Sequence, residues 1–465
     1  MTRGSIALFL AGDTIITRSW SHVNDEAFLG LIDEIRAADV AITNLETVIH
    51  EFKGYAQAVG GGTYLASPPQ VAADLKWAGF EMVAHANNHT FDYGTSGVLE
   101  TLEHVERAGL ILAGSGEDLQ HARAPKYCRC NGGTVALVAM ASDFVPFGKA
   151  SPSRPDQRGR PGLNPLTVIR ERALFAPKSI AKWLRTVGRL IGQKPKIGAR
   201  GFRFVSSPRN WRVDNADLHA NLGTISEAAS NADVVVVSLH AHGQGRWLAN
   251  FAHLAIEHGA HVIFVHGPHS ILGIELYRGR PIFYSMGDFV FEVEHIVRFP
   301  AEEYERLGLV PDAPLSALKS AKFADGKIRK RKTFEGFTTS VTLTDGCVTG
   351  IRLLPTDLQI DAHDAARGRP QLASSETGRR IIETVAQRSR KYGTRIGYDP
   401  QSQLRRGHFT DVRQRWNRMR GVRQKVTTKG LDGESCAPYS YPTFGMTSTL
   451  LLRFAPVLRE RLNVN

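Results

Sequence analysis

The sequence is poor in cysteine and has no long apolar run. Four cysteines in 465 residues are too few and too irregularly spaced for a disulfide framework or a zinc ribbon, so we expect buried or free thiols. No apolar run approaches the roughly 18 residues that span a bilayer. Gly12 and Asp13 interrupt the N-terminus, which has no cleavage site of small residues. These absences exclude a small secreted domain and predict a cytoplasmic protein without a membrane span.

Acidic residues are in the minority, and the excess of basic residues is local. The chain carries 58 Lys and Arg against 45 Asp and Glu, a formal net charge of +13. Residues 151–212 alone hold 15 basic and two acidic residues. The net charge of this segment, +13, equals that of the whole chain. No nucleic-acid-binding motif accompanies this charge, so we predict no nucleic-acid partner. With 42% apolar residues the chain can bury a sizeable core.

The basic segment is typical of an insertion, which we place at about 146–212. Pro and Gly crowd its start (SPSRPDQRGRPGLNP), and residues 179–194 have the spacing of a basic amphipathic helix. Such a helix most often packs on its own core. Two more specific alternatives are that this helix binds an acidic peptide or an anionic membrane surface.

The rest of the chain alternates strand-like and helix-like segments, which is typical of a layered α/β fold. Strand-like runs include SIALFLA, VAIT, EMVAHA, DVVVVSL and AHVIFV. Two hairpins follow, with turns at Gly279 and at Asp345-Gly346. We predict one domain over 1–365 with a second insertion at about 294–335, and a basic C-terminal extension over 366–465 that forms a helical arm.

Polar residues cluster where the predicted strands end. The carboxyl ends of strands line the ligand crevice of open α/β sheets, so these side chains are predicted to meet in one site. Taken singly, each is more often a hydrogen-bonded core, turn or cap residue. The set comprises Asp13, Asn44, Glu46, Asn87, Asn88, His89, His240, His242, His266 and His269.

This set suits the binding of two divalent ions. A carboxylate can bridge two ions while Asn and His complete the shells. His266 and His269 share one turn and can point into one cavity, whereas only one of His240 and His242 need be a ligand. His89 can serve as a proton donor instead.

Six ordered motifs resemble those of the CapA family, the poly-γ-glutamate capsule-synthesis proteins: AGDTII, ITNLETVI, HANNHTFDYG, VVVSLHAHG, VHGPHSILGIEL and RPIFYSMGDFVFE. The resemblance covers residues 5–145 and 215–292. It implies a calcineurin-like αββα sandwich of two mixed sheets, carrying the basic insertion and the C-terminal helical arm. It also implies an acid pair and a site for Mn, Zn or Fe. The acid pair is His89 and Asp92, and the metal site is Asp13, Glu46, Asn88, His240, His266 and His269.

One departure from the metallophosphatase pattern bears on the reaction. Ile15 stands where those enzymes usually carry a ligand His, so one of the two metal ions would lack a histidine ligand. CapA-like enzymes also occur in clusters that make lasso peptides, where such a member acts as a peptide epimerase. The resemblance therefore favours an isomerase that inverts a Cα in a ribosomally encoded peptide without a cofactor. The catalytic residues would be Asp13, His89, Asp92 and His295, and the substrate-binding residues Asn44, Asn87, His242 and Asp288.

Two alternatives stay open. A metal-dependent hydrolase or ligase-type enzyme would act on phosphoester or poly-γ-glutamyl substrates. A capsule or partner-binding scaffold would need no catalysis. In that case, changing Asp13 or His89 to Ala would leave the function of the protein intact. In the epimerase hypothesis the partner is a precursor peptide docked by the basic insertion. His295 is also compatible with a solvated loop histidine.

Overall fold

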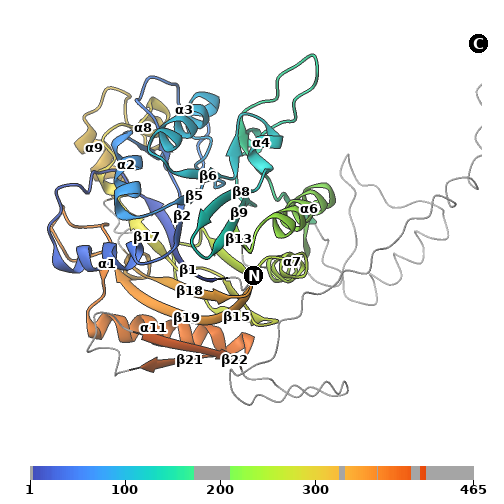
Figure 1. Cartoon of the computed structure of the whole chain (residues 1–465). Coiled ribbons are helices and arrows are strands. Elements are labelled where there is room, and N and C mark those ends of the chain that lie inside the picture. Colours follow the sequence, from blue (N-terminus) through green and yellow to red (C-terminus); the bar gives the residue numbers. More distant parts are fainter. Residues whose placement is uncertain are drawn as a thin grey trace, which may run out of the picture. The chain divides into compact units, whose positions relative to one another are not determined.

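The computed structural model describes residues 4–171, 210–243, 245–323, 330–363, 365–399 and 409–414. All of these residues belong to one compact unit, which runs to Arg420. The strand-like runs of the sequence form strands of two mixed sheets, and helices pack on the outer faces of both sheets (Figure 1). The predicted layered α/β fold is confirmed at this level.

The larger sheet has β1 (Ser5–Ile15) near its centre. In the described part of the chain it has eight strands in the order β20-β19-β18-β1-β2-β5-β6, and β17 also pairs with β1. Neighbours β2 and β17 run parallel to β1, whereas β18 runs antiparallel. The other strands are β2 (Val40–Leu45), β5 (Met82–Ala84), β6 (Ile111–Ala113), β17 (Asp288–Phe291), β18 (Glu335–Thr344), β19 (Cys347–Asp357) and β20 (Gln371–Leu372).

The smaller sheet has the order β15-β16-β14-β13-β9-β8 among the described residues. Its middle strands β9, β13, β14 and β16 are parallel, and the edge strands β8 and β15 are antiparallel to their neighbours. The sequence patterns above do not predict β8 and β9. The strands are β8 (Lys126–Cys130), β9 (Gly133–Ala141), β13 (Val234–His240), β14 (Val262–His266), β15 (Ile274–Tyr277) and β16 (Arg280–Phe283).

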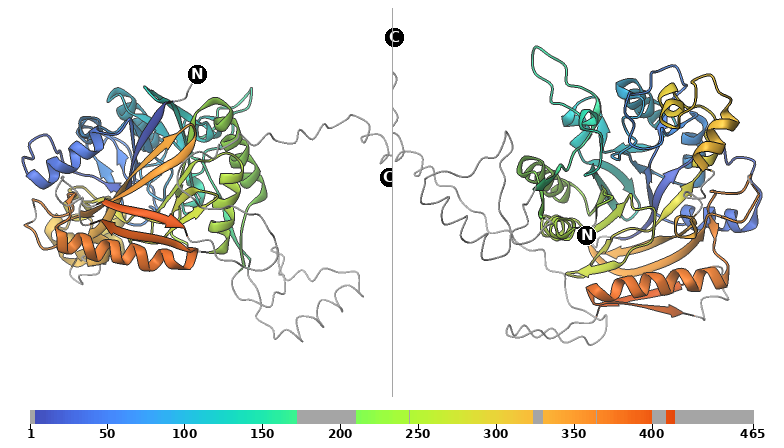
Figure 2. Two further views of the ribbon diagram at one scale, coloured as in Figure 1. Left: turned by 60° about the horizontal axis from the view of Figure 1, so that its bottom comes forward. Right: turned by 180° about the vertical axis from the view of Figure 1, so that it is seen from behind.

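The two sheets pack face to face, and strand alternation decides what each side chain buries against. On β1, Leu8 and Leu10 join the core between the sheets, whereas Phe9 packs under the outer helices. Full burial of such a side chain contributes about 1.5–3 kcal/mol to folding. Helices α1 (Glu26–Arg36), α2 (Gln70–Ala78) and α3 (Gly94–Arg107) cover the larger sheet, and α6 (Asn215–Asn231) and α7 (Arg246–Glu257) cover the smaller one (Figure 2).

Both predicted hairpins are present. The turn between β15 and β16 places Arg278 at φ 51° and Gly279 at φ 75°, and the turn between β18 and β19 places Asp345 at φ 53° and Gly346 at φ 76°. Two successive residues with positive φ are the signature of a type I′ turn, whose twist matches that of the strands. The turn residues therefore set the register of these pairs.

The basic insertion leaves and rejoins the core through two paired strands, β11 (Val168–Glu171) and β12 (Asn210–Val213). The predicted amphipathic helix at 179–194 lies outside the described residues. The described part of the second insertion forms η2 (Val293–His295), α8 (Ala301–Arg306), α9 (Leu315–Phe323) and α10 (Arg331–Phe334).

The C-terminal extension is not an arm over its described part. Its helix α11 (Ser375–Ser389) packs against β19 and β15, and its residues Ile381, Ile382 and Val385 are buried in a cluster that includes residues of both sheets. A hairpin of β21 (Thr394–Asp399) and β22 (Phe409–Gln414) adds strand structure to the predicted helices. The prediction of an arm fails over this part because the apolar face of α11 has to be buried against another element.

Short elements complete the described fold, and none of its helices has the length and apolar character to cross a membrane. The expectation of free thiols holds for Cys128 and Cys130 and is wrong for Cys347, which is disulfide-bonded. The short elements are β3 (Val48–Ile49), β4 (Ala66–Ser67), β7 (Ser115–Gly116), α4 (Leu119–Arg123), η1 (Pro146–Gly148), β10 (Gly162–Leu163) and η3 (Arg390–Tyr392).

Candidate metal centre

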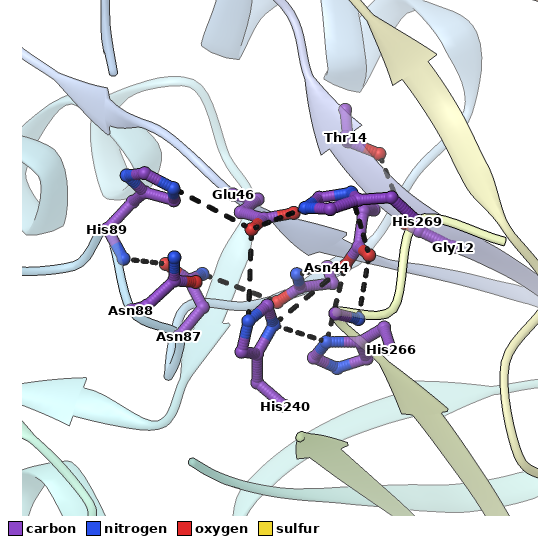
Figure 3. A network of polar contacts seen from close by, with 12 residues as sticks. Gly12, Thr14, Asn44, Glu46, Asn87, Asn88, His89, His240, His266 and His269 are labelled. Atoms are coloured by element: carbon purple, nitrogen blue, oxygen red, sulfur yellow. Dashed lines mark hydrogen bonds and ion pairs between the residues drawn. The ribbon is translucent and has the colours of Figure 1, made fainter. Parts of the chain in front are cut away.

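The carboxyl ends of β1, β2, β5, β13 and β14 meet at one cluster of polar side chains (Figure 3). Strand register brings the first members together. Asp13 on β1 is aligned with Asn44 on β2 and with Asp288 on β17, and His240 on β13 is aligned with His266 on β14. The structure therefore brings together residues that are far apart in the sequence.

Asp13 is a buried carboxylate held by two donors. Asn44 Nδ2 donates to Asp13 Oδ1 over 2.7 Å, and the Gly267 amide donates to Oδ2 over 2.8 Å. Burial by itself would raise the pKa of Asp13, but the hydrogen bond with His266 and the charges of the neighbouring histidines hold it well below its usual range. Asp13 is therefore ionised and fixed in orientation.

Glu46 is the second buried carboxyl group and has the opposite surroundings. Neither of its oxygens has a hydrogen-bond partner, and burial together with the charge of Asp13 raises its pKa well above the usual range. Figure 3 shows three imidazoles around it. Its Oε1 lies 3.8 Å from Nε2 of His240 and 3.9 Å from Nε2 of both His89 and His269.

His240 and His266 are neighbouring imidazoles on adjacent strands. Their Nδ1 atoms lie 3.0 Å apart, and His266 Nε2 is 2.7 Å from the Ser238 hydroxyl. Burial lowers the pKa of His240 well below its usual value, and its Nε2 has no partner. Ser238 was not among the predicted residues. Its position two residues before His240, on the same face of β13, is the signal for it.

His269 lies on the turn after β14 with φ 47°, in the left-handed region. Its Nδ1 is 2.7 Å from Asp288 Oδ1. Burial alone would lower its pKa, but the charges of Asp288 and Glu46 raise it well above its usual value. Burial also raises the pKa of Asp288 to about 6, against the effect of His269. The residue predicted to bind substrate, Asp288, is thus the hydrogen-bond partner of His269.

The loop after β5 carries the remaining members. Asn87 Nδ2 donates to the Leu45 carbonyl over 2.8 Å, and its Oδ1 accepts from the His89 amide over 3.1 Å, so Asn87 fixes the loop. His89 Nδ1 lies 2.7 Å from Asp92 Oδ2, as the acid pair requires. Asn88 Oδ1 is buried and has no partner.

His240 and His242 both face the cluster, at different depths. His240 is fully buried, whereas His242 is exposed at the rim, with its ring 5.0 Å from that of His240 and 6.0 Å from that of His269. The Asp143 carboxylate accepts from the His242 amide over 2.9 Å and fixes this rim.

His295 is not brought to the cluster by any contact of the described residues. Its Nε2 lies 3.2 Å from the Arg367 carbonyl, and the residue is the last of η2. Burial and the charge of Arg18 lower its pKa to about 4. The catalytic role of His295 therefore stays a prediction.

The donor atoms fit divalent metal ions. Buried polar atoms without a partner cost about 1–3 kcal/mol each, and in native proteins they usually indicate a missing ligand. The cluster holds five of them: Glu46 Oε1 and Oε2, His240 Nε2, Asn88 Oδ1 and Asp288 Oδ2. Imidazole and carboxylate donors suit Zn, Fe and Mn. Among the described residues, donor atoms within 4.8 Å of one another form three groups: Asp13, His240 and His266; Glu46, His240 and His242; and Asp13, Glu46, His269 and Asp288.

Comparison with known proteins shows the family of this α/β chain with its cluster of carboxylates and imidazoles. Residues 7–293 match the model described as "Bacterial capsule synthesis protein PGA_cap". The chain therefore belongs to this family, which confirms the resemblance to CapA.

Three relatives show how far the similarity extends. The uncharacterized protein y4sH of Sinorhizobium fredii (strain NBRC 101917 / NGR234) is 30% identical over 417 residues, 83% of this chain and 89% of that protein. The capsule biosynthesis protein CapA of Bacillus anthracis is 25% identical over 62% of this chain and 60% of its own. The PGA biosynthesis protein CapA of Bacillus subtilis (strain 168) is 27% identical over 55% and 54%.

Proposed function

We propose that this protein is a metal-dependent enzyme of the calcineurin-like metallophosphatase fold that cleaves or transfers γ-glutamyl amide bonds. The observation that carries the proposal is the set of five buried donor atoms without hydrogen-bond partners around Glu46. Helices on both outer faces of two packed mixed sheets support the αββα sandwich. The printed names of the two CapA relatives support a capsule or PGA substrate.

Some residues of the site would bind the metal ions, and others would orient these ligands. The residues of the three donor groups would hold the ions: Asp13, Glu46, His240, His242, His266, His269 and Asp288. Divalent ions in this position polarise a carbonyl or phosphoryl oxygen and lower the pKa of bound water. Asn44 and the Gly267 amide keep Asp13 oriented.

Cleavage of an amide also needs a proton for the leaving nitrogen. Asp92 holds Nδ1 of His89, so Nε2 of the same ring is directed toward Glu46 and the cluster. In hydrolysis, water adds to the carbonyl carbon and the C–N bond breaks. His89 gives a proton to the departing nitrogen, and the proton that the attacking water loses passes to solvent. His89 then needs only to regain that proton from solvent.

The local positive charge is consistent with an anionic chain as substrate. Residues 151–212 carry 15 basic residues against two acidic ones, and a charge of this size raises the local concentration of a polyanion. Poly-γ-glutamate carries one carboxylate per residue. An acidic precursor peptide would be attracted in the same way, so charge alone does not separate the two substrates.

The geometry favours this proposal over Cα epimerisation, which needs a base and an acid on opposite faces of one carbon. Both Asp13 oxygens already accept hydrogen bonds, and His295, one of the four residues predicted to be catalytic, is bonded to the Arg367 carbonyl. Metal-free proton transfer would also leave the donors around Glu46 without partners. Epimerisation is therefore an outcome to be tested.

The deciding experiment combines metal analysis with two substrates. We expect the purified protein to hold near two equivalents of Mn, Zn or Fe and to cleave γ-glutamyl oligomers, with activity lost to a chelator and restored by metal. Asp13→Asn should abolish this activity, and the exposed helix variant Glu383→Gln should not. Metal-free protein that places deuterium at a peptide Cα in D₂O would overturn the proposal in favour of the epimerase.

A further inference from the structure

Three consecutive glycines, Gly60, Gly61 and Gly62, lie against the loop that carries Asn88 and His89. The Gly61 amide donates to Asp92 Oδ1 over 2.8 Å, and the Gly61 carbonyl accepts from Asn88 Nδ2 over 2.9 Å. One residue that carries no functional side chain is therefore bonded to both Asn88 and Asp92.

The contact leaves no room for a side chain at Gly61. A Cβ there would lie 1.9 Å from the Asn88 carbonyl oxygen and 2.5 Å from the Asn88 carbonyl carbon. These are backbone atoms and cannot turn aside as the end of a flexible side chain can. The two backbones approach each other as closely as glycine allows.

The Gly61 carbonyl also decides which way the Asn88 amide points. A carbonyl oxygen can only accept, so it selects the Nδ2 side of the amide and turns Oδ1 away from itself. That Oδ1 is buried and has no hydrogen-bond partner. Asn88 lies beside Asn87 and His89 at the cluster (Figure 3). The outcome is a buried oxygen without a hydrogen-bond partner on a residue beside the cluster.

Asp92 is held in the same way on the other side of the loop. Its Oδ1 accepts from Gly61, and its Oδ2 accepts from the Leu65 amide over 2.9 Å while lying 2.7 Å from His89 Nδ1. The segment 60–65 therefore fixes the carboxylate that orients His89.

We propose that Gly61 is a positioning residue: its carbonyl orients Asn88 so that Oδ1 serves as a metal ligand, and its amide helps Asp92 to hold His89. This inference rests on the proposed metal-dependent function for its consequence, but the hydrogen bonds themselves do not need the metal. Supporting groups of this kind typically change metal affinity by 10–100-fold when they are removed.

The test uses two measurements on the full chain. In metal-free wild-type protein with labelled asparagine, the side-chain amide of Asn88 should exchange its hydrogens at least tenfold more slowly than in Gly61→Ala. In titrations with Mn or Zn alone, Gly61→Ala should bind at least one ion about tenfold or more weakly. The matched control is Gly223→Ala on α6, where an added Cβ meets nothing within 4 Å.

The outcomes separate the inference from the proposed function. Equal amide exchange in wild type and Gly61→Ala, or metal affinity of Gly61→Ala equal to that of Gly223→Ala, would overturn the inference. A wild-type protein that takes up no metal would overturn the proposed function, while amide exchange still decides whether Gly61 holds Asn88. If Gly61→Ala fails to fold, the wild type decides. Fast exchange of its Asn88 side-chain amide would overturn the inference, and slow exchange would support the hydrogen bond from Asn88 to the Gly61 carbonyl.

Discussion

Asp13 and Glu46 are both fully buried carboxyl groups, yet their surroundings shift their pKa values in opposite directions. Asp13 accepts two hydrogen bonds and lies among imidazoles, whereas Glu46 has no hydrogen-bond donor at all. Burial of an unpaired carboxylate is unfavourable, so Glu46 weakens the metal-free fold. Residues that oppose stability in this way are typical of functional sites.

Glu46→Gln should therefore separate binding from stability. We expect metal affinity to fall at least tenfold because a charged ligand is lost. The metal-free variant should unfold at the same temperature as wild type or higher, since position 46 no longer carries a buried carboxyl group without a partner. Thermal unfolding in chelator and metal titration measure the two effects, and a clear loss of metal-free stability would contradict the account of Glu46.

His295→Gln should change the pH dependence of stability and leave the chemistry intact. The folded-state pKa of His295 is about 4, below its usual value, so its contribution to stability is present above about pH 6.5 and is lost as the pH falls toward 4. Wild-type stability should then fall more steeply than that of the variant between pH 7 and 4.5. A large loss of activity at pH 8 would instead restore the catalytic role predicted from the sequence.

At the scale of elements, strand β1 shows how one segment serves both the core and the site. Its alternating residues face the inter-sheet core and the outer helices, and its carboxyl end carries Asp13. Register shifts next to Asp13 mark irregular pairing with both β2 and β17. Irregularities of this kind commonly redirect a side chain next to an active site.

Helix α11 provides the element-scale prediction. Ile381→Ala should destabilise the protein by about 2–5 kcal/mol because Ile381 is fully buried in the hydrophobic core. Its exposed neighbour on the same helix, changed as Glu383→Ala, should stay within about 0.5 kcal/mol of wild type. Urea unfolding followed by circular dichroism compares the two. Equal stability of both variants would mean that the extension after 365 is independent of the core.

At the scale of the whole molecule, the candidate metal centre is built from residues of both sheets. Asp13 and Glu46 come from the larger sheet, while His240 and His266 come from the smaller one. Metal bound between them would therefore resist separation of the sheets. Ligands that bind only the folded state stabilise it in proportion to the logarithm of their concentration.

Metal removal should lower stability by a predictable amount. At a metal concentration about one hundred times the dissociation constant, we expect about 2.7 kcal/mol of stabilisation per ion over the chelated protein. Differential scanning calorimetry across a metal series measures it. Asp13→Asn is the control, and its unfolding temperature should not respond to metal. Identical curves with and without metal for wild type would contradict the proposed centre.

The sequence alone determined the layered α/β class, both hairpins and most of the residues of the centre. Periodicity marks β1, β13 and β14, and positive-φ residues such as Gly279 and Gly346 mark turns, because these signals depend on neighbours in the chain. The carboxyl ends of parallel strands share an edge, which is why Asp13, His240 and their partners were predicted to meet.

Only the tertiary structure decided the contacts across the fold. It paired His295 with the Arg367 carbonyl and Asp288 with His269, and it placed Gly61 against Asn88. It also packed the apolar face of α11 against β19 and β15. Such contacts join residues remote in the chain, and they depend on how whole elements pack rather than on any local pattern of residues.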